Sequence, residues 1–239
     1  MRFRKKNYKE EDKNIFSQLT KNNPYIAHVY NFPNILLPHP SIQNFQELLE
    51  IKKRKKTKLD SKKIHLEIGC GSGRYLIEWA NKNTQDTFIG IELRYKRLVL
   101  AAKKIDQQHI KNILLMRDHG EFFDEYFQKY GLDYLHINFP DPWTKKKQRK
   151  NRLLNKDFIY KLYSIMSFNG EFRFKTDHLE YFETVTKILA GIKGFTITEY
   201  SKNLHSSIYN EKNILTEFEM LFKSKRNPPI GYLLAKKIN

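Results

Sequence analysis

The stretch that decides the fold reads Ile64-His-Leu-Glu67-Ile-Gly69-Cys-Gly71-Ser-Gly73-Arg74. A short apolar run carries an acid near its end, passes through three alternating glycines and enters Arg74–Asn81, whose apolar residues have helical spacing. Glycine lets the backbone turn sharply and approach a ligand closely. The stretch therefore predicts a strand, a ligand-binding turn and a helix, in that order.

The same alternation of strand and helix continues along the chain. The predicted strands are Ile64–Ile68, Thr87–Glu92, Ile113–Met116, Tyr134–Phe139 and Glu171–Thr176, and the predicted helices are Arg74–Asn81, Tyr95–Ile105, Asp157–Ser167 and Leu179–Ala190. After Gly194, three segments have the pattern of strands without helices between them: Phe195–Ser201, Phe218–Ser224 and Tyr232–Lys236. This order predicts an α/β, Rossmann-like fold, with a mostly parallel sheet, helices on both faces and an antiparallel C-terminal edge.

The first 60 residues differ in composition from the rest. They are polar and basic, are interrupted by four prolines, and end in the run Lys52-Lys-Arg-Lys-Lys-Thr-Lys58. We expect residues 1–60 to form a basic N-terminal extension, an extended arm with one short helix near Ile42–Ile51. Residues 61–239 then form one α/β domain.

Charge narrows the class of partner. Lys and Arg number 44 against 26 Asp and Glu, a formal net charge of +18. An enzyme of small metabolites has no need of such charge, whereas a polyphosphate ligand such as RNA gives a reason for it. A Lys- and Asn-rich genome would explain the total, but not the clustering of the charges described below.

Other features exclude several kinds of site. The single cysteine, Cys70, rules out an internal disulfide and is predicted to be a small packing residue rather than a nucleophile. The eight histidines lack ligand spacing, so we expect no metal. No apolar run approaches the ~18 residues of a membrane span, and the first residues lack the apolar core of a signal peptide. We expect a soluble, cytoplasmic protein without membrane association.

The glycine turn favours one cofactor over another. A dinucleotide-binding fingerprint has a further glycine at the position of Arg74, whereas here the pattern is E-x-G-x-G-x-G, with Glu67 at the strand end. S-adenosylmethionine has no phosphates, and its ammonium and sulfonium groups suit an acid at that point. Glu92 ends the next strand, where a carboxylate accepts both ribose hydroxyls. Asp118 follows the third strand and is either an adenine contact or a solvated loop acid.

A second segment carries the expected chemistry. The fourth strand leads into Phe139-Pro-Asp141-Pro-Trp143 and then into Lys145–Arg152, in which six of eight residues are basic. Two prolines fix the backbone around Asp141, at the edge of the sheet where the chemistry of such folds collects. Trp143 is either a stacking platform for a base or a core residue. The basic run predicts phosphate contacts beside the active site.

These residues resemble a known family. Phe-Pro-Asp-Pro-Trp followed by a Lys/Arg-rich stretch is similar to the signature of the tRNA (guanine-N7-)-methyltransferases. Phe174-Lys-Thr-Asp177 and Thr216-Glu217-Phe218-Glu219 match two further motifs in the family's order, and the resemblance covers roughly residues 60–238. It implies a class I methyltransferase fold that uses S-adenosyl-L-methionine and methylates the guanine at position 46 in the tRNA variable loop.

The resemblance also implies residue roles. The glycine turn (Gly69, Gly71, Gly73) together with Glu67, Glu92, Asp118 and Asp141 would contact the cofactor, and Asp141 would be the catalytic residue. Lys145, Asp177 and the segment Thr216, Glu217, Phe218 and Glu219 would bind the target nucleotide. One position departs from the pattern: the family's third-strand acid lies one residue further on, where this chain has His119. We expect the enzyme to act without a partner protein, as a monomer or homodimer.

Guanine N7 fits the residues chemically. It has a free lone pair and no proton to remove, so positioning matters more than a strong base. Two alternatives remain. An N6-adenine methyltransferase has Asp/Asn-Pro-Pro-aromatic in this loop, whereas Asp141-Pro-Trp lacks the second proline, and Asn227-Pro228-Pro229-Ile230 lacks the aromatic. A non-catalytic RNA-binding protein on the same scaffold is disfavoured, because Glu67, the glycines, Glu92 and Asp141 are intact.

Overall fold

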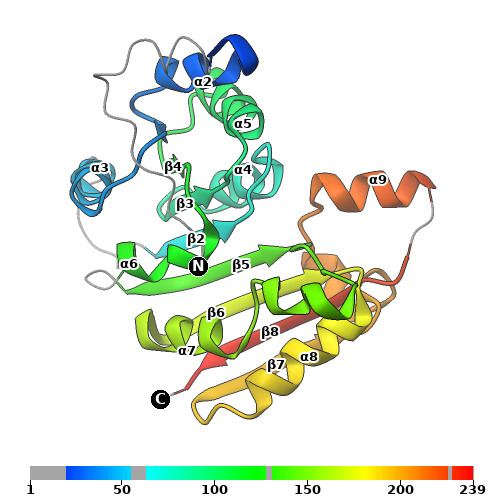
Figure 1. The fold of residues 1–239 in the computed structure, drawn as a ribbon. Coiled ribbons are helices and arrows are strands. Elements are labelled where there is room, and N and C mark those ends of the chain that lie inside the picture. Colours follow the sequence, from blue (N-terminus) through cyan, green and yellow to red (C-terminus); the bar gives the residue numbers. More distant parts are fainter. Residues whose placement is uncertain (1–19, 55–62, 128–130, 226–227, 239) are drawn as a thin grey trace.

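One eight-stranded sheet organises the molecule (Figure 1), with the strand order β1-β4-β3-β2-β5-β6-β8-β7. The computed structural model describes residues 20–54, 63–127, 131–225 and 228–238. The strands are β1 (Leu36–Leu37), β2 (Ile64–Ile68), β3 (Thr87–Ile91), β4 (Ile113–Met116), β5 (Leu132–Asn138), β6 (Met166–Thr176), β7 (Phe195–Ser201) and β8 (Gly231–Lys237). β8 runs antiparallel to both β6 and β7, and the other pairings are parallel. The predicted mostly parallel sheet with an antiparallel C-terminal edge is confirmed.

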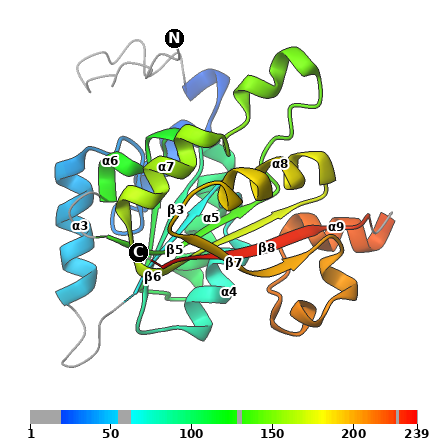
Figure 2. The same cartoon turned by 90° about the horizontal axis from the view of Figure 1, so that it is seen from below.

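Helices cover both faces of the sheet (Figure 2), with α7 and α8 on one side and α4 on the other. The α-helices are α2 (Tyr25–His28), α3 (Ile42–Arg54), α4 (Arg74–Lys82), α5 (Tyr95–Gln107), α6 (Asp124–Phe127), α7 (Lys156–Ile165), α8 (Leu179–Ala190) and α9 (Glu217–Lys225), and the 3-10 helices are η1 (Val29–Asn31), η2 (Gly120–Phe122), η3 (Lys146–Asn151), η4 (Leu204–Ser206) and η5 (Ile208–Lys212). The predicted helices are confirmed, with ends that differ by up to two residues.

The sequence explains why the central strands hold two cores apart. Every residue of β2 and β3 is buried, as expected of parallel strands that have helices on both faces. Successive side chains point to opposite faces, so Phe88 packs with the α4 and α5 side while Ile89 packs with the α3, α6, α7 and α8 side. The carboxyl ends of β2, β3, β5 and β6 consequently meet at one edge of a rigid sheet.

One predicted strand is wrong. Phe218–Ser224 lies in the helix α9, which extends to one side of the sheet in Figure 1. The preceding Thr216-Glu-Phe-Glu219 is the reason, because Thr and Glu three residues apart make reciprocal hydrogen bonds that start a helix. The backbone N–H of Glu219 donates to Thr216 Oγ1 at 3.1 Å, and the N–H of Thr216 donates to Glu219 Oε2 at 2.9 Å. The β-type composition of the segment is overridden by this helix start.

The N-terminal segment is also more ordered than an extended arm. Within residues 20–54, β1 pairs in parallel with β4, Leu36 opposite Leu115, and α3 covers the expected helix near Ile42–Ile51 with a longer C-terminal end. Phe45 and Leu49 of α3 are fully buried in the main core. The prediction of an extended arm is therefore wrong for this part. The run Lys52–Lys58 lies largely outside the described residues, and the division at residue 60 stays a prediction.

Candidate active site

A pocket opens where the strand order reverses between β2 and β5, the position at which open parallel sheets bind ligands. Its lining comes from the glycine turn after β2, from the ends of β3 and β5, and from the start of α9. Seven of the predicted site residues line it: Glu67, Gly69, Gly71, Glu92, Thr216, Glu217 and Phe218. Gly73, Asp118, Asp141, Lys145, Asp177 and Glu219 lie outside this lining.

Glu67 is the unusual group in the pocket. Its side chain is 2% exposed, and its Oε1 accepts a hydrogen bond from Asn138 Nδ2 at 3.0 Å. Its Oε2 is buried and has no hydrogen-bond partner among the described residues. Burial raises the pKa of Glu67 from 4.5 to about 8, an effect that the Asn138 hydrogen bond and the charge of Lys175 offset only partly. A buried acceptor without a partner is costly, so a cation at this point would relieve the cost.

The glycine turn and Glu92 form the adjoining wall. Gly69, Gly71 and Gly73 all have positive φ, and a Cβ on Gly73 would lie 3.0 Å from the Cβ of Ala101, so α4 and α5 pack too closely for a side chain there. Glu92 Oε2 accepts from Gly71 N at 3.2 Å, and its Oε1 accepts from the backbone N–H groups of Leu93 and Arg94, both at 2.9 Å. Three backbone donors thus orient Glu92, and a carboxylate has about four acceptor positions.

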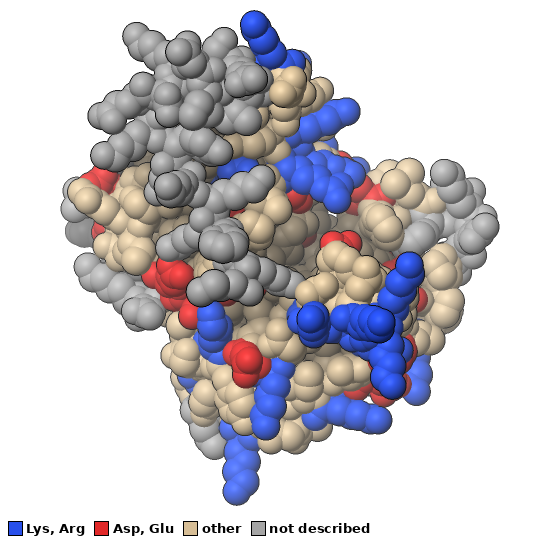
Figure 3. Space-filling model, viewed as in Figure 1, with Lys and Arg blue, Asp and Glu red and all other residues tan. Residues whose placement is uncertain are grey.

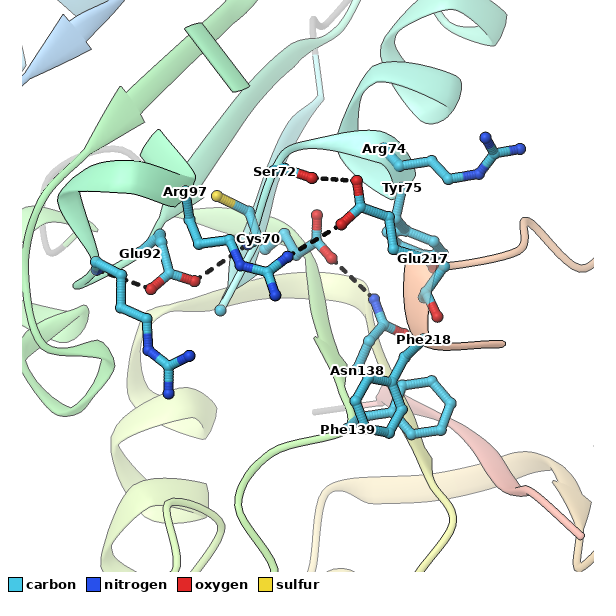
Figure 4. Close-up of a pocket in the computed structure, with 15 residues that line it drawn as sticks. Cys70, Ser72, Arg74, Tyr75, Glu92, Arg97, Asn138, Phe139, Glu217 and Phe218 are labelled. Atoms are coloured by element: carbon cyan, nitrogen blue, oxygen red, sulfur yellow. Dashed lines mark hydrogen bonds and ion pairs between the residues drawn. The ribbon is translucent and has the colours of Figure 1, made fainter. Parts of the chain in front are cut away.

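Glu217 joins α9 to the glycine turn. Figure 4 shows its carboxylate reaching Ser72 and Arg97 across the pocket. It accepts a hydrogen bond from the Ser72 hydroxyl and forms ion pairs with Arg97 at 3.1 Å and Lys104 at 3.0 Å. Burial alone would raise the pKa of Glu217, but the hydrogen bonds and the two cations outweigh it and lower the pKa. Glu217 therefore carries a negative charge that closes one side of the pocket.

Glu219 points into the protein interior instead. It is 0% exposed and forms a buried ion pair with Lys175 of β6 at 3.1 Å, while Asn213 Nδ2 donates to it at 2.9 Å. Burial would raise the pKa of Glu219, but the charge of Lys175 and the hydrogen bonds lower it. Together with the pair to Thr216, these contacts fix the start of α9 against the sheet. In this arrangement Glu219 holds the segment, and Phe218 is its exposed member, at 47%.

The Pro-Asp-Pro loop follows β5 beside the pocket. Phe139 and Trp143 bracket it with φ of 51° and 42°, a left-handed conformation that is uncommon outside glycine. The Phe139 ring lies 5.2 Å from that of Phe218, and Figure 4 shows the two rings against each other at the pocket wall. Asp141 is exposed, and its carboxylate makes no hydrogen bond or ion pair to another residue of the described ranges.

Asp177 and Lys145 stand near the same edge. β5 and β6 are parallel neighbours with Asn138 opposite Lys175, so Asp141 and Asp177 follow adjacent strand ends. Both Asp177 and Lys145 are exposed. The fold thus brings the predicted acids to one edge of the sheet, although it does not test their roles.

The basic run after the loop divides into two kinds of residue. Lys145, Lys146, Lys147, Arg149 and Lys150 are exposed on or next to η3. Arg152 is 5% exposed and bonded within the protein, so its prediction as a phosphate contact is corrected. In Figure 3, Lys and Arg side chains lie on both sides of a hollow in this face of the molecule.

Asp118 is engaged locally. Its Oδ1 accepts from the backbone N–H of His119 at 2.8 Å, and its Oδ2 accepts from the Tyr126 hydroxyl at 2.5 Å. A contact between Asp118 and adenine stays a prediction. In the described ranges, no cluster of three or more His, Cys, Asp or Glu residues is arranged to hold a metal ion. No helix there combines the length and hydrophobicity that a membrane crossing requires.

Sequence reasoning missed several residues of the site. Asn138 holds Glu67, Ser72 receives Glu217, and Arg97 faces the pocket from α5. Asn138 gave a usable signal, since it is a polar residue near the end of an apolar strand. Ser72 and Arg97 gave none, because Glu217, the partner of both, is more than a hundred residues away in the sequence.

Comparison with known sequences decides the family. Residues 61–230 match a family described as "Putative methyltransferase". The chain is 36% identical over 189 residues to the tRNA (guanine-N(7)-)-methyltransferase of Mycoplasma genitalium, covering 78% of this chain and 90% of that protein. This chain belongs to the tRNA (guanine-N(7)-)-methyltransferase family. The predicted family is confirmed, and with it an enzyme that uses S-adenosylmethionine.

Further relatives agree. The Enterococcus faecalis tRNA (guanine-N(7)-)-methyltransferase is 38% identical over 162 residues, 68% of this chain and 75% of that protein. A bifunctional glycosyltransferase/methyltransferase of Fusobacterium nucleatum is 35% identical over 97% of this chain, which spans only 36% of that longer protein.

Solved structures support the fold. The 16S rRNA methyltransferase KamB superposes with a TM-score of 0.58 at 13% identity, covering 81% of this chain and 94% of that chain. TrmN from Thermus thermophilus gives 0.54 at 15% identity, covering 82% and 48%. At these identities the likeness concerns the fold alone, and the Rossmann-like methyltransferase fold is confirmed.

The pocket fits the family's methyl donor. S-adenosylmethionine carries an ammonium group, and Glu67 offers a buried carboxylate oxygen without a partner in the described structure. Its ribose has two hydroxyls, and Glu92 presents an oriented carboxylate on the neighbouring strand. The donor set is therefore the one that this molecule needs, and a cation at Glu67 would stabilise the ionised form.

Proposed function

We propose that this chain transfers the methyl group of S-adenosylmethionine to N7 of guanine in tRNA, at position 46 of the variable loop. The observation that carries the proposal is the partnerless buried oxygen of Glu67, in a pocket beside the loop of Asp141. Family relatives that bear this activity in their names cover most of the chain.

Each residue of the pocket has a defined task in this reaction. Glu67 holds the ammonium group, Glu92 accepts the ribose hydroxyls, and the turn of Gly69, Gly71 and Gly73 lets the main chain lie against the cofactor. When bound, S-adenosylmethionine supplies an electrophilic methyl group on a sulfonium. We assign Asp118 to the adenine edge, as the resemblance implies.

The target base is held by the opposite wall. Phe218 offers an exposed ring for the base, the hydroxyl of Thr216 and the carboxylate of Asp177 offer acceptors, and Glu217 and Glu219 fix the segment. Lys145 and the exposed cations Lys146, Lys147, Arg149 and Lys150 contact phosphates.

Asp141 carries the catalytic role in this proposal. N7 attacks through its lone pair and loses no proton, so the purine ring gains positive charge as the methyl group arrives. A carboxylate fixed near the ring stabilises that charge without accepting a proton. The rigid Pro-Asp-Pro loop provides such a carboxylate. Because N7 is buried in the deep groove of A-form RNA, the target must be a loop or splayed base.

A tRNA with one atom changed tests the proposal. Purified protein, S-adenosylmethionine and tRNA are incubated, and the nucleosides are separated by mass spectrometry. We expect 7-methylguanosine from ordinary tRNA and no methylation of tRNA that carries 7-deazaguanine at position 46, although both bind. Methyladenosine would support the N6-adenine alternative, and the absence of any product would support a non-catalytic RNA-binding protein.

The setting of the reaction follows from its substrate. We propose that the protein acts in the cytoplasm, without a partner protein, as a monomer or homodimer. The basic segment of residues 1–60 is proposed to be an extension of the catalytic domain formed by residues 61–239.

A further inference from the structure

Arg152 ends the basic run but is enclosed by the protein. Its Nε donates to the carbonyl oxygen of Pro142 at 2.7 Å. Its two terminal nitrogens donate to the two oxygens of Glu180 at 3.3 and 2.6 Å, and the guanidinium lies 4.6 Å from the centre of the Tyr181 ring. Hydrogen bonds from Arg152 lower the pKa of Glu180. One planar group thus links the loop of Asp141 to the start of α8.

The loop needs such a link. Phe139 and Trp143 are in the left-handed region, which costs conformational energy that surrounding contacts must offset. Pro140 and Pro142 have no N–H to donate. At one end the N–H of Phe139 donates to the carbonyl of Lys175 at 2.8 Å. At the other end the carbonyl of Pro142 accepts from Arg152. Asp141 lies between these two fixed points.

We infer that Arg152 is a positioning residue, which fixes Asp141 by holding the Pro142 carbonyl, and that it does not bind RNA phosphate. This inference rests on the proposed function, since it takes Asp141 to be the reacting loop's carboxylate. Arginine suits the task because its planar fork serves the Glu180 carboxylate and a carbonyl at once. A lysine at the same position keeps the charge but cannot make this set of bonds.

Arg149 provides a matched comparison. It belongs to the same segment and also pairs with Glu180, at 3.3 Å, but it is exposed and has no bond to Pro142. We compare Arg152→Gln and Arg152→Lys with Arg149→Gln. Each is measured for kcat at saturating tRNA, KM for tRNA, and tRNA affinity at several salt concentrations.

Opposite splits are expected. Arg152→Gln and Arg152→Lys should both lower kcat about tenfold or more, since misplaced groups lose catalysis steeply, while tRNA affinity and its salt slope stay within error of wild type. Arg149→Gln should raise KM and reduce the salt slope by about 0.7–0.9, as for one lost phosphate contact. The inference is overturned if Arg152→Lys keeps the wild-type kcat, or if Arg152→Gln reduces the salt slope.

Glu180→Gln guards against misfolding of the Arg152 variants, since Glu180 is half exposed, at 45%. It loosens the clamp and adds net positive charge. We expect a lower kcat with equal or tighter tRNA binding. An unchanged kcat in this variant would count against the inference.

Trp143 gives a signal independent of methylation. The chain has two tryptophans, so in a Trp79→Phe background the fluorescence comes from Trp143, next to Pro142. Acrylamide should quench it more strongly after Arg152→Gln than after Arg149→Gln. Equal quenching would refute the loop's dependence on Arg152. If the wild type makes no 7-methylguanosine, the proposed function fails while this measurement still decides the structural part.

Discussion

Glu67→Gln is expected to stabilise the protein without cofactor while abolishing cofactor binding. Burial raises the pKa of Glu67 from 4.5 to about 8 because its Oε2 is enclosed without a partner in the described structure. Glutamine keeps an oxygen that accepts the hydrogen bond from Asn138 but does not titrate. The ionisation of one buried carboxylate is thus the main difference between the two proteins.

The magnitude follows from linkage. The unfolded chain releases the Glu67 proton near pH 4.5 and the folded chain only near pH 8, so wild-type folding must retain a proton between these values. The stability contributed by the neutral form is complete below pH 4.5 and is lost as the pH rises to about 8. Each pH unit costs about 1.4 kcal/mol, so wild type loses under about 1 kcal/mol at pH 5 and about 3 kcal/mol at pH 7.

Unfolding measurements across pH test this. Thermal or urea unfolding of both proteins is followed from pH 5 to 8.5 without cofactor. The variant's advantage should be small at pH 5, which serves as an internal control, and reach about 6–12 °C in Tm at pH 7. Added S-adenosylmethionine should stabilise wild type alone. A difference in stability that does not change with pH would refute the reasoning, because Glu67 would then ionise normally in the folded protein.

Three further outcomes are expected. Glu92→Ala should weaken cofactor binding by about 2 kcal/mol in calorimetry, with tRNA binding intact, because the ribose hydroxyls lose a charged acceptor; an unchanged affinity would remove Glu92 from the site. Asp141→Asn should bind both substrates but lower the single-turnover rate about 10²–10³-fold, and the wild-type rate should be flat above about pH 6; a basic limb in that profile would instead indicate proton removal. Neutralising four exposed cations should weaken tRNA binding and flatten its salt dependence by up to ~0.7–0.9 per contact, whereas a wild-type slope would mean a merely solvated surface; the four are Lys146, Lys147, Arg149 and Lys150.

The sequence predicted the α/β core because its signals are local. Strands such as Ile64–Ile68 are apolar throughout, and Leu179–Ala190 has helical spacing over its whole length, so each is visible in a short window. The error at Phe218–Ser224 was also local. Its β-type residues were weighed, while the Thr216–Glu219 helix start immediately before them was not.

Other features depend on residues far apart in the chain. Arg152 looks like its five basic neighbours, and only Glu180 and Tyr181, 28 and 29 positions later, draw it into the interior. Glu67 and Asn138 are likewise 71 positions apart. Composition fixes the charge of such a segment but not the direction of each side chain, which the packing of α8 against the loop decides.

The pairing of β1 with β4 bears on any attempt to shorten the protein. A shortened chain that begins at residue 61 would keep the cofactor pocket but would leave the backbone of β4 as an open edge, which invites association between molecules. It would also bare apolar surface now covered by Leu36, Phe45 and Leu49. A truncation that preserves solubility must therefore retain residues 20–54, whatever the RNA requires of them.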